Sequence, residues 1–423
     1  MTTVWILLAL LALLFIRVPV AFALGGLGLF LLWLKDINVV MVPQALYSTA
    51  DSFVLLAVPL FLLMSNILLK GGVGKDLFNA VQSWVGHWPG GLGVATILSC
   101  AMFSAISGSS VATAATIATV AIPEMIKRGY NRPFVLGLLA AGGTLGILIP
   151  PSIPMILYGV ITEESIVSLF MAGVGPGLLL TGLFICYCLV YSLFDKNYKP
   201  SPKASWSERL STSVRALPTL ILAIVVIGGI YLGIFTPTES AGIGFALSLI
   251  IVLILGTLSW EKLKLAVMES MVTTITIFLI IAGAKIFGKA ITLYRIPQDI
   301  SMAITTNIGE PWLFVLVVCA VLLIMGFFLE SISMLLIMVP VLHPALGAMM
   351  LDPIWFGVLF VVMIECALIS PPVGMNLFVI QAVAKVNLGE VVKGVWPFIL
   401  MMFGTVVVIY LFPDIVLYIP FKL

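Results

Sequence analysis

The sequence predicts an all-α polytopic membrane protein with two re-entrant helical hairpins and two broken helices, arranged as an inverted repeat. Of its 423 residues, 62% are hydrophobic and only 9% are charged, with a mean hydropathy of +1.26. A soluble chain of this length cannot bury so much apolar surface. Two further observations complete the prediction: apolar segments interrupted by small residues or proline, and a pattern that recurs at a fixed offset.

Composition also excludes several classes of function. The net charge is +2 and the basic residues form no cluster, so we expect no nucleic-acid partner. The five cysteines all lie in apolar stretches without a CxxC pair, which favours buried thiols over a metal site or a disulfide framework. Neither a phosphate-binding GxxxxGK loop nor a nucleophile–base pair is evident, so we expect neither ATP hydrolysis nor an enzyme.

Nine apolar stretches predict full membrane spans. They are Val4–Leu34, Phe53–Leu69, Phe134–Tyr158, Ile166–Phe194, Val214–Ile234, Glu239–Leu258, Ala266–Phe287, Trp355–Phe378 and Val395–Tyr418. The first stretch is interrupted at Arg17-Val18-Pro19, so it is either one tilted helix or two short ones. It lacks a charged leader and a cleavage site, and we expect it to be retained.

Loop charges predict the orientation. With the first stretch treated as one span, fourteen Lys and Arg residues fall on the N-terminal side and four on the other, namely Lys35, Lys289, Arg295 and Lys422. Cytoplasmic loops carry the excess of Lys and Arg, so the N-terminal side is predicted to be cytoplasmic. The polar link Asp195–Arg215 then joins the two halves along that surface.

The first hairpin is predicted over residues 92–125. Its legs, Leu92–Ile106 and Val111–Met125, have 15 residues each. At about 1.5 Å per residue each leg reaches roughly 22 Å, short of a hydrocarbon core of about 30 Å. Ser107-Gly108-Ser109-Ser110 would form the tip near the middle of the membrane.

The first broken helix is predicted over residues 134–158, with interruptions at Gly142-Gly143-Thr144, Gly146 and Pro150-Pro151. Proline donates no backbone hydrogen bond and clashes with the preceding turn, so free carbonyls are expected there. Unpaired backbone at this depth is tolerated only inside protein or beside a polar cavity. A hairpin tip facing a broken helix is how many secondary transporters build ion and substrate sites.

The same pattern recurs 221 residues later. Pro150-Pro151 aligns with Pro371-Pro372, and four further pairs keep the offset: Ser110 with Ser331, Pro123 with Pro344, Gly173 with Gly394, and Pro176 with Pro397. The second hairpin is predicted over residues 312–346 and the second broken helix over 355–378. Five crossings separate the copies, an odd number, so the repeat is inverted and the two tips face each other.

Both tips carry candidate chemistry. The hydroxyls and close-approach backbone of Ser107, Gly108, Ser109 and Ser110, facing the Gly143–Pro151 interruption, suit a hard monovalent cation. The alternative is that these small residues only let the hairpin legs pack closely. In the second copy Glu330 and Glu365 are acids in apolar surroundings. They are either functional groups, or partners of Lys285, or protonated side chains that sit between helices.

The half-helix ends are candidate anion sites, because helix N-termini present unpaired N–H groups. Thr113 is either a further hydroxyl ligand or bonds a carbonyl one turn back. The candidate substrate contacts are Ser110, Thr113, Pro150, Ser152, Glu330, Pro371, Gly374 and Asn376.

Four motifs taken together resemble the large membrane subunit of tripartite ATP-independent periplasmic (TRAP) transporters, over essentially the whole chain. They are FSAISGSSVAT, GGTLGILIPPSIPMILYG, GGIYLGIFTPTESA and ISPPVGMNLFV. The resemblance implies sodium-driven elevator transport in a bacterial inner membrane, with a small membrane subunit and a periplasmic substrate-binding protein as partners. The substrate implied is a small organic anion, such as a C4-dicarboxylate, sialic acid or a sulfonate.

The resemblance also implies sites and domains. The sodium ligands carry over to Ser107, Gly108, Ser109, Gly143, Gly146, Ser331, Ser333, Ala367 and Ser370. Residues 1–91 and 196–311 would form a scaffold, and residues 92–195 and 312–423 a transport domain. The alternative function is a stand-alone sodium/dicarboxylate symporter or antiporter that needs no binding protein.

Overall fold

The computed structural model of the chain describes residues 2–37, 40–195, 198–307 and 309–422. Within these ranges the regular elements are twenty α-helices and one short 3-10 helix, without a strand. This confirms the predicted all-α fold class. The domain limits predicted at residues 1, 196 and 423 lie outside the described residues.

The helices follow one another with short connections. They are α1 (Thr2–Phe15), α2 (Val20–Leu34), α3 (Met41–Ala50), the 3-10 helix η1 (Val54–Leu56), α4 (Ala57–Lys70), α5 (Val73–Val85), α6 (Gly91–Ser107), α7 (Ser110–Lys127), α8 (Arg132–Leu148), α9 (Ile153–Thr162), α10 (Ile166–Phe194), α11 (Trp206–Tyr231), α12 (Pro237–Ile254), α13 (Trp260–Leu293), α14 (Ile296–Asn307), α15 (Pro311–Met325), α16 (Ser331–Ala348), α17 (Pro353–Ile369), α18 (Met375–Ala384), α19 (Leu388–Leu411) and α20 (Asp414–Lys422).

Among the described residues, six helices are long and apolar enough to cross a membrane alone, and two bent pairs raise this number to eight. The six are α10, α11, α12, α13, α16 and α19, and the pairs are α3 with α4 and α8 with α9. The amphipathic helices α3, α5 and α14 were not anticipated, because segments of this kind carry too few apolar residues to be recognised as spans.

The first predicted span is two helices. The chain turns at Arg17, whose φ of +67° is left-handed, and Pro19 then begins α2. Neither α1, with 14 residues, nor α2, with 15, reaches about 30 Å at 1.5 Å per residue. Of the two alternatives, the structure therefore has two short helices in place of one tilted helix. The charge bias among the later loops does not depend on this choice.

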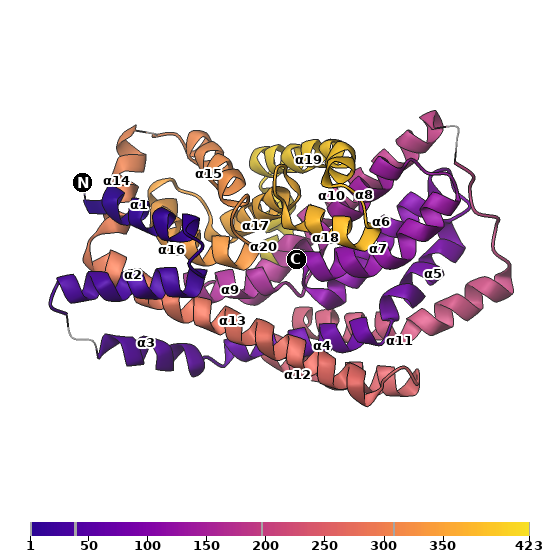
Figure 1. Ribbon diagram of the computed structural model, residues 1–423, viewed down its shortest axis with the longest axis horizontal. Coiled ribbons are helices and arrows are strands. Elements are labelled where there is room, and N and C mark those ends of the chain that lie inside the picture. Colours follow the sequence, from indigo (N-terminus) through magenta and orange to yellow (C-terminus); the bar gives the residue numbers. More distant parts are fainter. Residues whose placement is uncertain (1, 38–39, 196–197, 308, 423) are drawn as a thin grey trace.

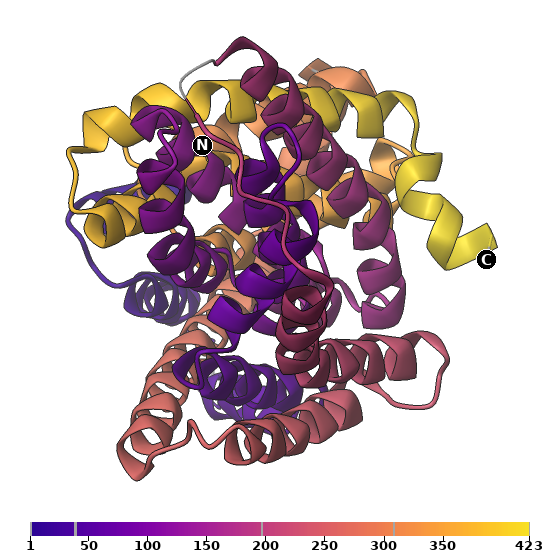
Figure 2. The same ribbon diagram turned by 90° about the vertical axis from the view of Figure 1, so that its right-hand side faces the viewer.

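The helices form two groups on opposite sides of the molecule. The helices α4, α12 and α13 run along one edge, with α2 packed on α13, while α15 and α19 lie at the opposite edge (Figures 1 and 2). The 34 residues of α13 extend over about 51 Å. Such a helix exceeds the hydrocarbon thickness and must tilt or project from it.

Glycine lets these helices approach closely. Gly25 of α2 faces the backbone of Gly283 in α13, and a Cβ at Gly28 would lie 2.9 Å from the backbone of Phe287. In the other group Gly137 of α8 and Gly394 of α19 cross with their backbones in contact. Small residues at helix crossings are the usual means of tight packing in membranes.

The first hairpin is confirmed. The helices α6 and α7 pack against each other, and Thr96 Oγ1 lies 3.5 Å from Met125 Sδ at the open end. The chain reverses at Gly108, whose φ of +58° suits glycine. The legs have 17 and 18 residues, slightly longer than predicted, and reach about 26–27 Å.

The broken helices are interrupted at the prolines only. The axis bends by 40° between α8 and α9, at Ile149–Ser152, and Gly143 and Gly146 lie inside α8. The second break similarly follows Ile369, so Ala367 is helical. Reading the glycines and Ala367 as part of the breaks was wrong. Glycine, unlike proline, has a backbone N–H that can donate the helical hydrogen bond, so it does not break the helix. The role of these glycines is close packing.

The internal repeat is confirmed by the element limits. The helices α7 and α8, shifted by 221 residues, begin and end at the same positions as α16 and α17. The Pro150–Pro151 and Pro371–Pro372 peptide bonds are both cis. The two copies of the repeat also pack against each other. The helix α7 of the first copy contacts α18 of the second, and α16 of the second contacts α9 of the first.

The second copy departs from the first at its hairpin. The helices α15 and α16 are not packed along each other as α6 and α7 are, and α16 packs instead against α9 and α14. Residues 326–330 connect them, and the end of α15 still meets the second broken helix, because Gly326 lies against Ala367. The second hairpin is therefore splayed, with α14 beside one leg.

Contacts among the loops agree with the predicted division into a basic side and an opposite side of the membrane. On the basic side, Lys70 forms an ion pair with Glu269 at 2.8 Å, and the Lys199 N–H donates to the carbonyl of Arg128 at 2.9 Å. On the other side, Lys35 donates to the carbonyl of Leu293 at 2.7 Å. The polar link after α10 thus lies against the end of α7, as expected.

Candidate functional site

The first hairpin tip is a compact group of hydroxyls. The Ser107 Oγ and Thr113 Oγ1 atoms are 2.7 Å apart and both residues are buried. Ser109 caps α7, because its Oγ accepts from the Ala112 N–H at 3.4 Å. Gly108 allows the reversal between the two serines. Ser107, Ser109 and Thr113 thus lie close together at the chain reversal between α6 and α7.

This tip is seated against the first broken helix. A Cβ at Gly146 would lie 2.6 Å from the carbonyl oxygen of Ser109, and one at Gly108 would lie 2.6 Å from that of Pro151. A Cβ at Gly143 would be 2.6 Å from the Cβ of Ala114. The glycines therefore bring the tip and the break into backbone contact.

The proline pair supplies further oxygens at this contact. Pro150 and Pro151 have no N–H, so the carbonyls of Gly146 and Ile147 receive no helical hydrogen bond from them. These carbonyls, the Ser109 carbonyl and the two tip hydroxyls make an oxygen-rich, uncharged environment. Hard monovalent cations prefer oxygen ligands of this kind.

The half-helix α9 begins immediately beyond the break. Ser152 is fully buried, and its Oγ accepts from the Met155 N–H at 3.4 Å as the helix cap. Its neighbour Pro150 is also buried. The structure thus gives the Ser152 hydroxyl a local capping role.

The second tip carries the acid. Glu330 precedes α16, and Ser333 Oγ donates to Glu330 Oε1 at 3.4 Å. Ser333 is buried and Ser331 is half-buried. At the break, Ser370 Oγ donates to the carbonyl of Cys366 at 2.7 Å.

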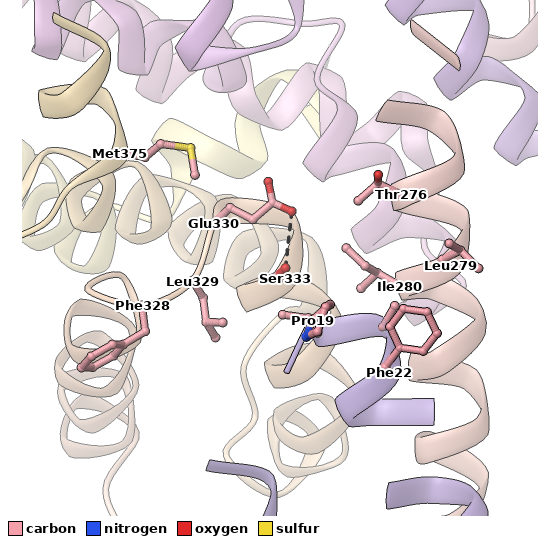
Figure 3. Close-up of a pocket in the computed structure, with 12 residues that line it drawn as sticks. Pro19, Phe22, Thr276, Leu279, Ile280, Phe328, Leu329, Glu330, Ser333 and Met375 are labelled. Atoms are coloured by element: carbon pink, nitrogen blue, oxygen red, sulfur yellow. Dashed lines mark hydrogen bonds between the residues drawn. The ribbon is translucent and has the colours of Figure 1, made fainter. Parts of the chain in front are cut away.

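Glu330 and Ser333 line a pocket of about 440 Å³ (Figure 3). The other walls come from α2 and α13 on one side and from the end of the second hairpin and α18 on the other. The lining residues are Pro19, Val20, Ala21, Phe22, Thr276, Leu279, Ile280, Phe328, Leu329, Glu330, Ser333 and Met375. The pocket therefore lies between the two helix groups, and Glu330 is the one charged side chain among the described residues that line it.

Pro371 and Gly374 lie in the break that leads to this pocket. They precede Met375, which lines it as the first residue of α18. Asn376 follows and is fully buried, with neither Oδ1 nor Nδ2 hydrogen-bonded within the described residues. The second half-helix thus starts at the wall of the pocket.

Glu365 lies in the first half of the second broken helix and is not among the residues that line this pocket. Its side chain is fully buried in α17, and neither carboxylate oxygen has a hydrogen-bond partner among the described residues. Its polar neighbour is Ser110, the first residue of α7. Glu365, a candidate residue of the second copy, thereby lies beside Ser110, a candidate residue of the first copy.

Lys285 is not the partner of either acid. Its Nζ donates to the carbonyl and Oγ of Ser48 at 3.3 and 3.4 Å, so the structure does not support the alternative in which Lys285 pairs with Glu330 or Glu365. The pocket residues that α13 contributes, Thr276 and Ile280 among them, were missed. Nothing local distinguishes them from other residues of α13, and only the packing brings them to the second tip.

A membrane-spanning chain in which hairpin tips meet proline-broken helices of an inverted repeat belongs to the class of secondary transporters. The family model described as "Tripartite ATP-independent periplasmic transporter, DctM component" matches residues 7–415. The chain therefore belongs to this family and is the large permease subunit of a TRAP transporter, not an enzyme.

Two curated relatives illustrate the similarity. The chain is 39% identical to the C4-dicarboxylate TRAP transporter large permease protein DctM of Pseudomonas aeruginosa, over 89% of this chain and 88% of that protein. It is 36% identical to the ectoine TRAP transporter large permease protein TeaC of Halomonas elongata, over 86% and 85% respectively.

A solved structure has a similar fold. The crystal structure of the YdaH transporter of Alcanivorax borkumensis aligns with a TM-score of 0.62 over 87% of each chain. The sequences are only 14% identical, so the similarity concerns the fold.

Proposed function

We propose that this permease takes up a small organic anion, driven by sodium, across a bacterial inner membrane. A periplasmic binding protein delivers the anion, and a small membrane subunit enlarges the scaffold. The observation that carries the proposal is the seating of a hydroxyl-rich tip against a proline-broken helix in the first copy of the internal repeat.

Sodium at the first site would be held by Ser107, Ser109 and Thr113 together with the Gly146 carbonyl. This set is supported by the 2.7 Å contact between the Ser107 and Thr113 hydroxyls and by the close approach of Gly146 to Ser109. The second site would use Ser331, Ser333, Ser370 and the end of α17 around Ala367. Neither set contains a carboxylate, which suits a weakly bound ion that must be released.

The anion would bind at the pocket beside the second tip. Two unit charges about 5 Å apart, at an effective dielectric constant of about 20, repel by roughly 3 kcal/mol. An anion next to Glu330 therefore needs compensation by cations bound at the tips and by the N-terminus of α18. This requirement links anion binding to sodium binding.

Movement would follow the division between the helix groups. The pocket has one wall on α2 and α13 and the other on the second repeat. We propose that residues 92–195 and 312–423 move as the transport domain against a scaffold of residues 1–91 and 196–311. A pocket on such a boundary would be carried across the membrane with the moving wall.

The test is uptake into liposomes that contain the permease, with and without the small subunit and the binding protein of the same transporter. A sodium gradient is imposed, and radiolabelled succinate, sialic acid, ectoine and isethionate are compared. Sodium-dependent uptake that requires both partners supports the proposal. Uptake by the permease alone favours the stand-alone symporter, and uptake of every acid without sodium overturns sodium coupling.

A further inference from the structure

Another pocket, of about 340 Å³, lies on the basic side of the molecule, which the loop charges predict to be cytoplasmic. Its walls come from α5, from the end of α7, and from the link between α10 and α11 together with the first turns of α11. Eight of the ten residues that line it have polar or charged side chains, whereas the pocket beside Glu330 has mostly apolar walls. Neither the proposed sodium sites nor the proposed substrate site includes any of these residues.

Two hydrogen-bond donors in the link have no partner at this pocket. Ser201 is 9% exposed, and its Oγ forms no hydrogen bond within the described residues, although the Ser201 N–H donates to the carbonyl of Gly86 at 3.2 Å. Lys203 forms no ion pair with another described residue. Buried hydroxyls are nearly always hydrogen-bonded, and leaving one unpaired is unfavourable. A ligand with acceptor oxygens would therefore find donors already in place.

The charges around the pocket favour an anion. Arg128 and Lys203 line it, and Arg128 also pairs with Glu124 through its Nε at 3.3 Å. Glu208 is the acid of the wall, and it is exposed to water, which screens its charge. The next residue, Arg209, is buried, and its Nε and Nη2 have no partner within the described residues. Three cations against two acids leave a net positive charge at this place.

The N-terminus of α11 adds to this positive charge. Ala204, just before the Ser205 cap, and Glu208, in the first turn, both line the pocket. The 26-residue helix carries a partial positive charge at this end. The Ser205 Oγ accepts from the Glu208 N–H at 3.2 Å, and the first N–H groups of a helix otherwise lack an intrahelical partner. A helix N-terminus beside arginine and lysine is a usual binding place for phosphate groups.

The pocket has room for more than a phosphate group. Its volume of about 340 Å³ falls at the lower end of the range of about 300–1,000 Å³ for small-molecule sites. Asn79 and Gln82 line it from α5 with amide groups. Amides both donate and accept hydrogen bonds, so they suit hydroxyl groups next to a phosphate. The walls therefore match a phosphate group that is attached to a small polyol.

We propose that this pocket binds a phosphate group esterified to a small polyol, supplied either by a soluble metabolite or by the headgroup of a phospholipid. Arg128, Lys203 and the Ser201 hydroxyl hold the phosphate, and the amides of Asn79 and Gln82 hold the polyol. The binding site stands on the pocket and its unpaired donors, and it does not depend on the function proposed above.

The site also lies across the boundary along which the proposed transport domain moves. Arg128 ends the first hairpin, whereas α5, α11 and the link belong to the proposed scaffold. The link already touches the hairpin, because the Lys199 N–H donates to the carbonyl of Arg128 at 2.9 Å. A ligand that contacts both sides binds best in this arrangement and shifts the population towards it. Occupancy therefore slows uptake, and this regulatory step rests on the proposed function.

The first measurement is the binding of radiolabelled sn-glycerol 3-phosphate to the assembled transporter in lipid nanodiscs, by equilibrium dialysis. Lys203→Gln removes one charge-assisted contact and should raise the Kd at least about fivefold. Ser201→Ala should raise it about threefold without lowering the melting temperature, because the hydroxyl forms no hydrogen bond within the described residues. The matched control is Lys199→Gln, an exposed lysine of the same link that does not line the pocket, and it should bind as the wild type does.

A phospholipid in the pocket would block the soluble compound, so retained lipid is counted as well. Native mass spectrometry of the detergent-purified complex reports the phospholipids that stay bound. One phospholipid fewer in Lys203→Gln than in Lys199→Gln, with no binding of sn-glycerol 3-phosphate to either, assigns the site to a lipid headgroup and supports the proposal. Equal affinity for sn-glycerol 3-phosphate in the two variants overturns it, as does the absence of binding together with equal lipid counts.

Regulation is tested in the uptake assay, with sn-glycerol 3-phosphate enclosed in the liposomes. Binding protein added outside serves only permeases whose periplasmic face is outside, so the enclosed compound meets the cytoplasmic face. It should slow the initial uptake of the wild type at least about threefold and leave Lys203→Gln unaffected. If a lipid occupies the site, Lys203→Gln should instead take up the acid faster than Lys199→Gln.

The outcomes separate the binding site from the proposed function. Binding without any of these changes in uptake overturns the regulatory role. Absence of sodium-driven uptake in the wild type, with binding intact, counts against the proposed function and leaves the phosphate site supported.

Discussion

The contact between Gly146 and the first hairpin tip gives the sharpest test of the proposed sodium site. In Gly146→Ala the new Cβ would lie 2.6 Å from the Ser109 carbonyl oxygen and 2.8 Å from Thr113 Oγ1, whereas ordinary contacts begin at 3.4 Å. The tip must therefore retreat by about 0.6–0.8 Å. Overpacking of this size typically costs about 1–3 kcal/mol. This free-energy cost destabilises the arrangement of Ser109 and Thr113 that would hold the sodium ion.

The expected result is a five- to 150-fold increase, approximately, in the sodium concentration for half-maximal uptake, since about 1.4 kcal/mol corresponds to a factor of ten. Uptake is measured in liposomes against sodium concentration, and thermal unfolding of the purified complex reports folding. The matched control is Gly182→Ala in α10, where a Cβ meets nothing within 4 Å. A half-maximal concentration within twofold of the wild type in Gly146→Ala would refute the assignment of this contact to sodium binding.

Three further predictions follow from the same geometry. Ser107→Ala combined with Ser109→Ala removes a tip hydroxyl and the cap of α7, so sodium dependence of uptake should weaken while the complex still assembles on gel filtration. A cysteine at Met350, which is 91% exposed, should react with an impermeant maleimide from outside, and one at Lys127 should not; the reverse reactivity contradicts the topology. Gly394→Ala places a Cβ against the Pro133 backbone and should lower the melting temperature of the complex, and an unchanged melting temperature contradicts this packing.

The sequence predicted the parts of the site that depend on local chemistry. Serine and glycine at positions 107–110 made the first reversal recognisable, because such residues end apolar helices and permit left-handed backbone. The proline pairs fixed both breaks, since proline donates no hydrogen bond wherever it lies. The prediction failed where glycine was treated like proline: Gly143 and Gly146 stay helical and act by packing.

The periodicity of the sequence also did not reveal that the two legs of the second hairpin, α15 and α16, are splayed apart. The helices α6 and α15 are similar apolar segments, and α14, which packs beside α16, is short and partly polar. Arg17 left open whether one helix or two precede residue 35, and only the backbone conformation decided it. The sodium ligands and the domain division stay predictions.

By itself, the sequence determined that the chain is a helical membrane protein with an inverted repeat, because hydropathy and proline positions are local properties that the bilayer converts directly into structure. Only the tertiary structure decided which surfaces meet. It brought Glu330 to Thr276 and Pro19 across one pocket, and Glu365 to Ser110 across the two repeats. These contacts join residues far apart in the chain, and their partners are chosen by packing shape, which no local pattern records.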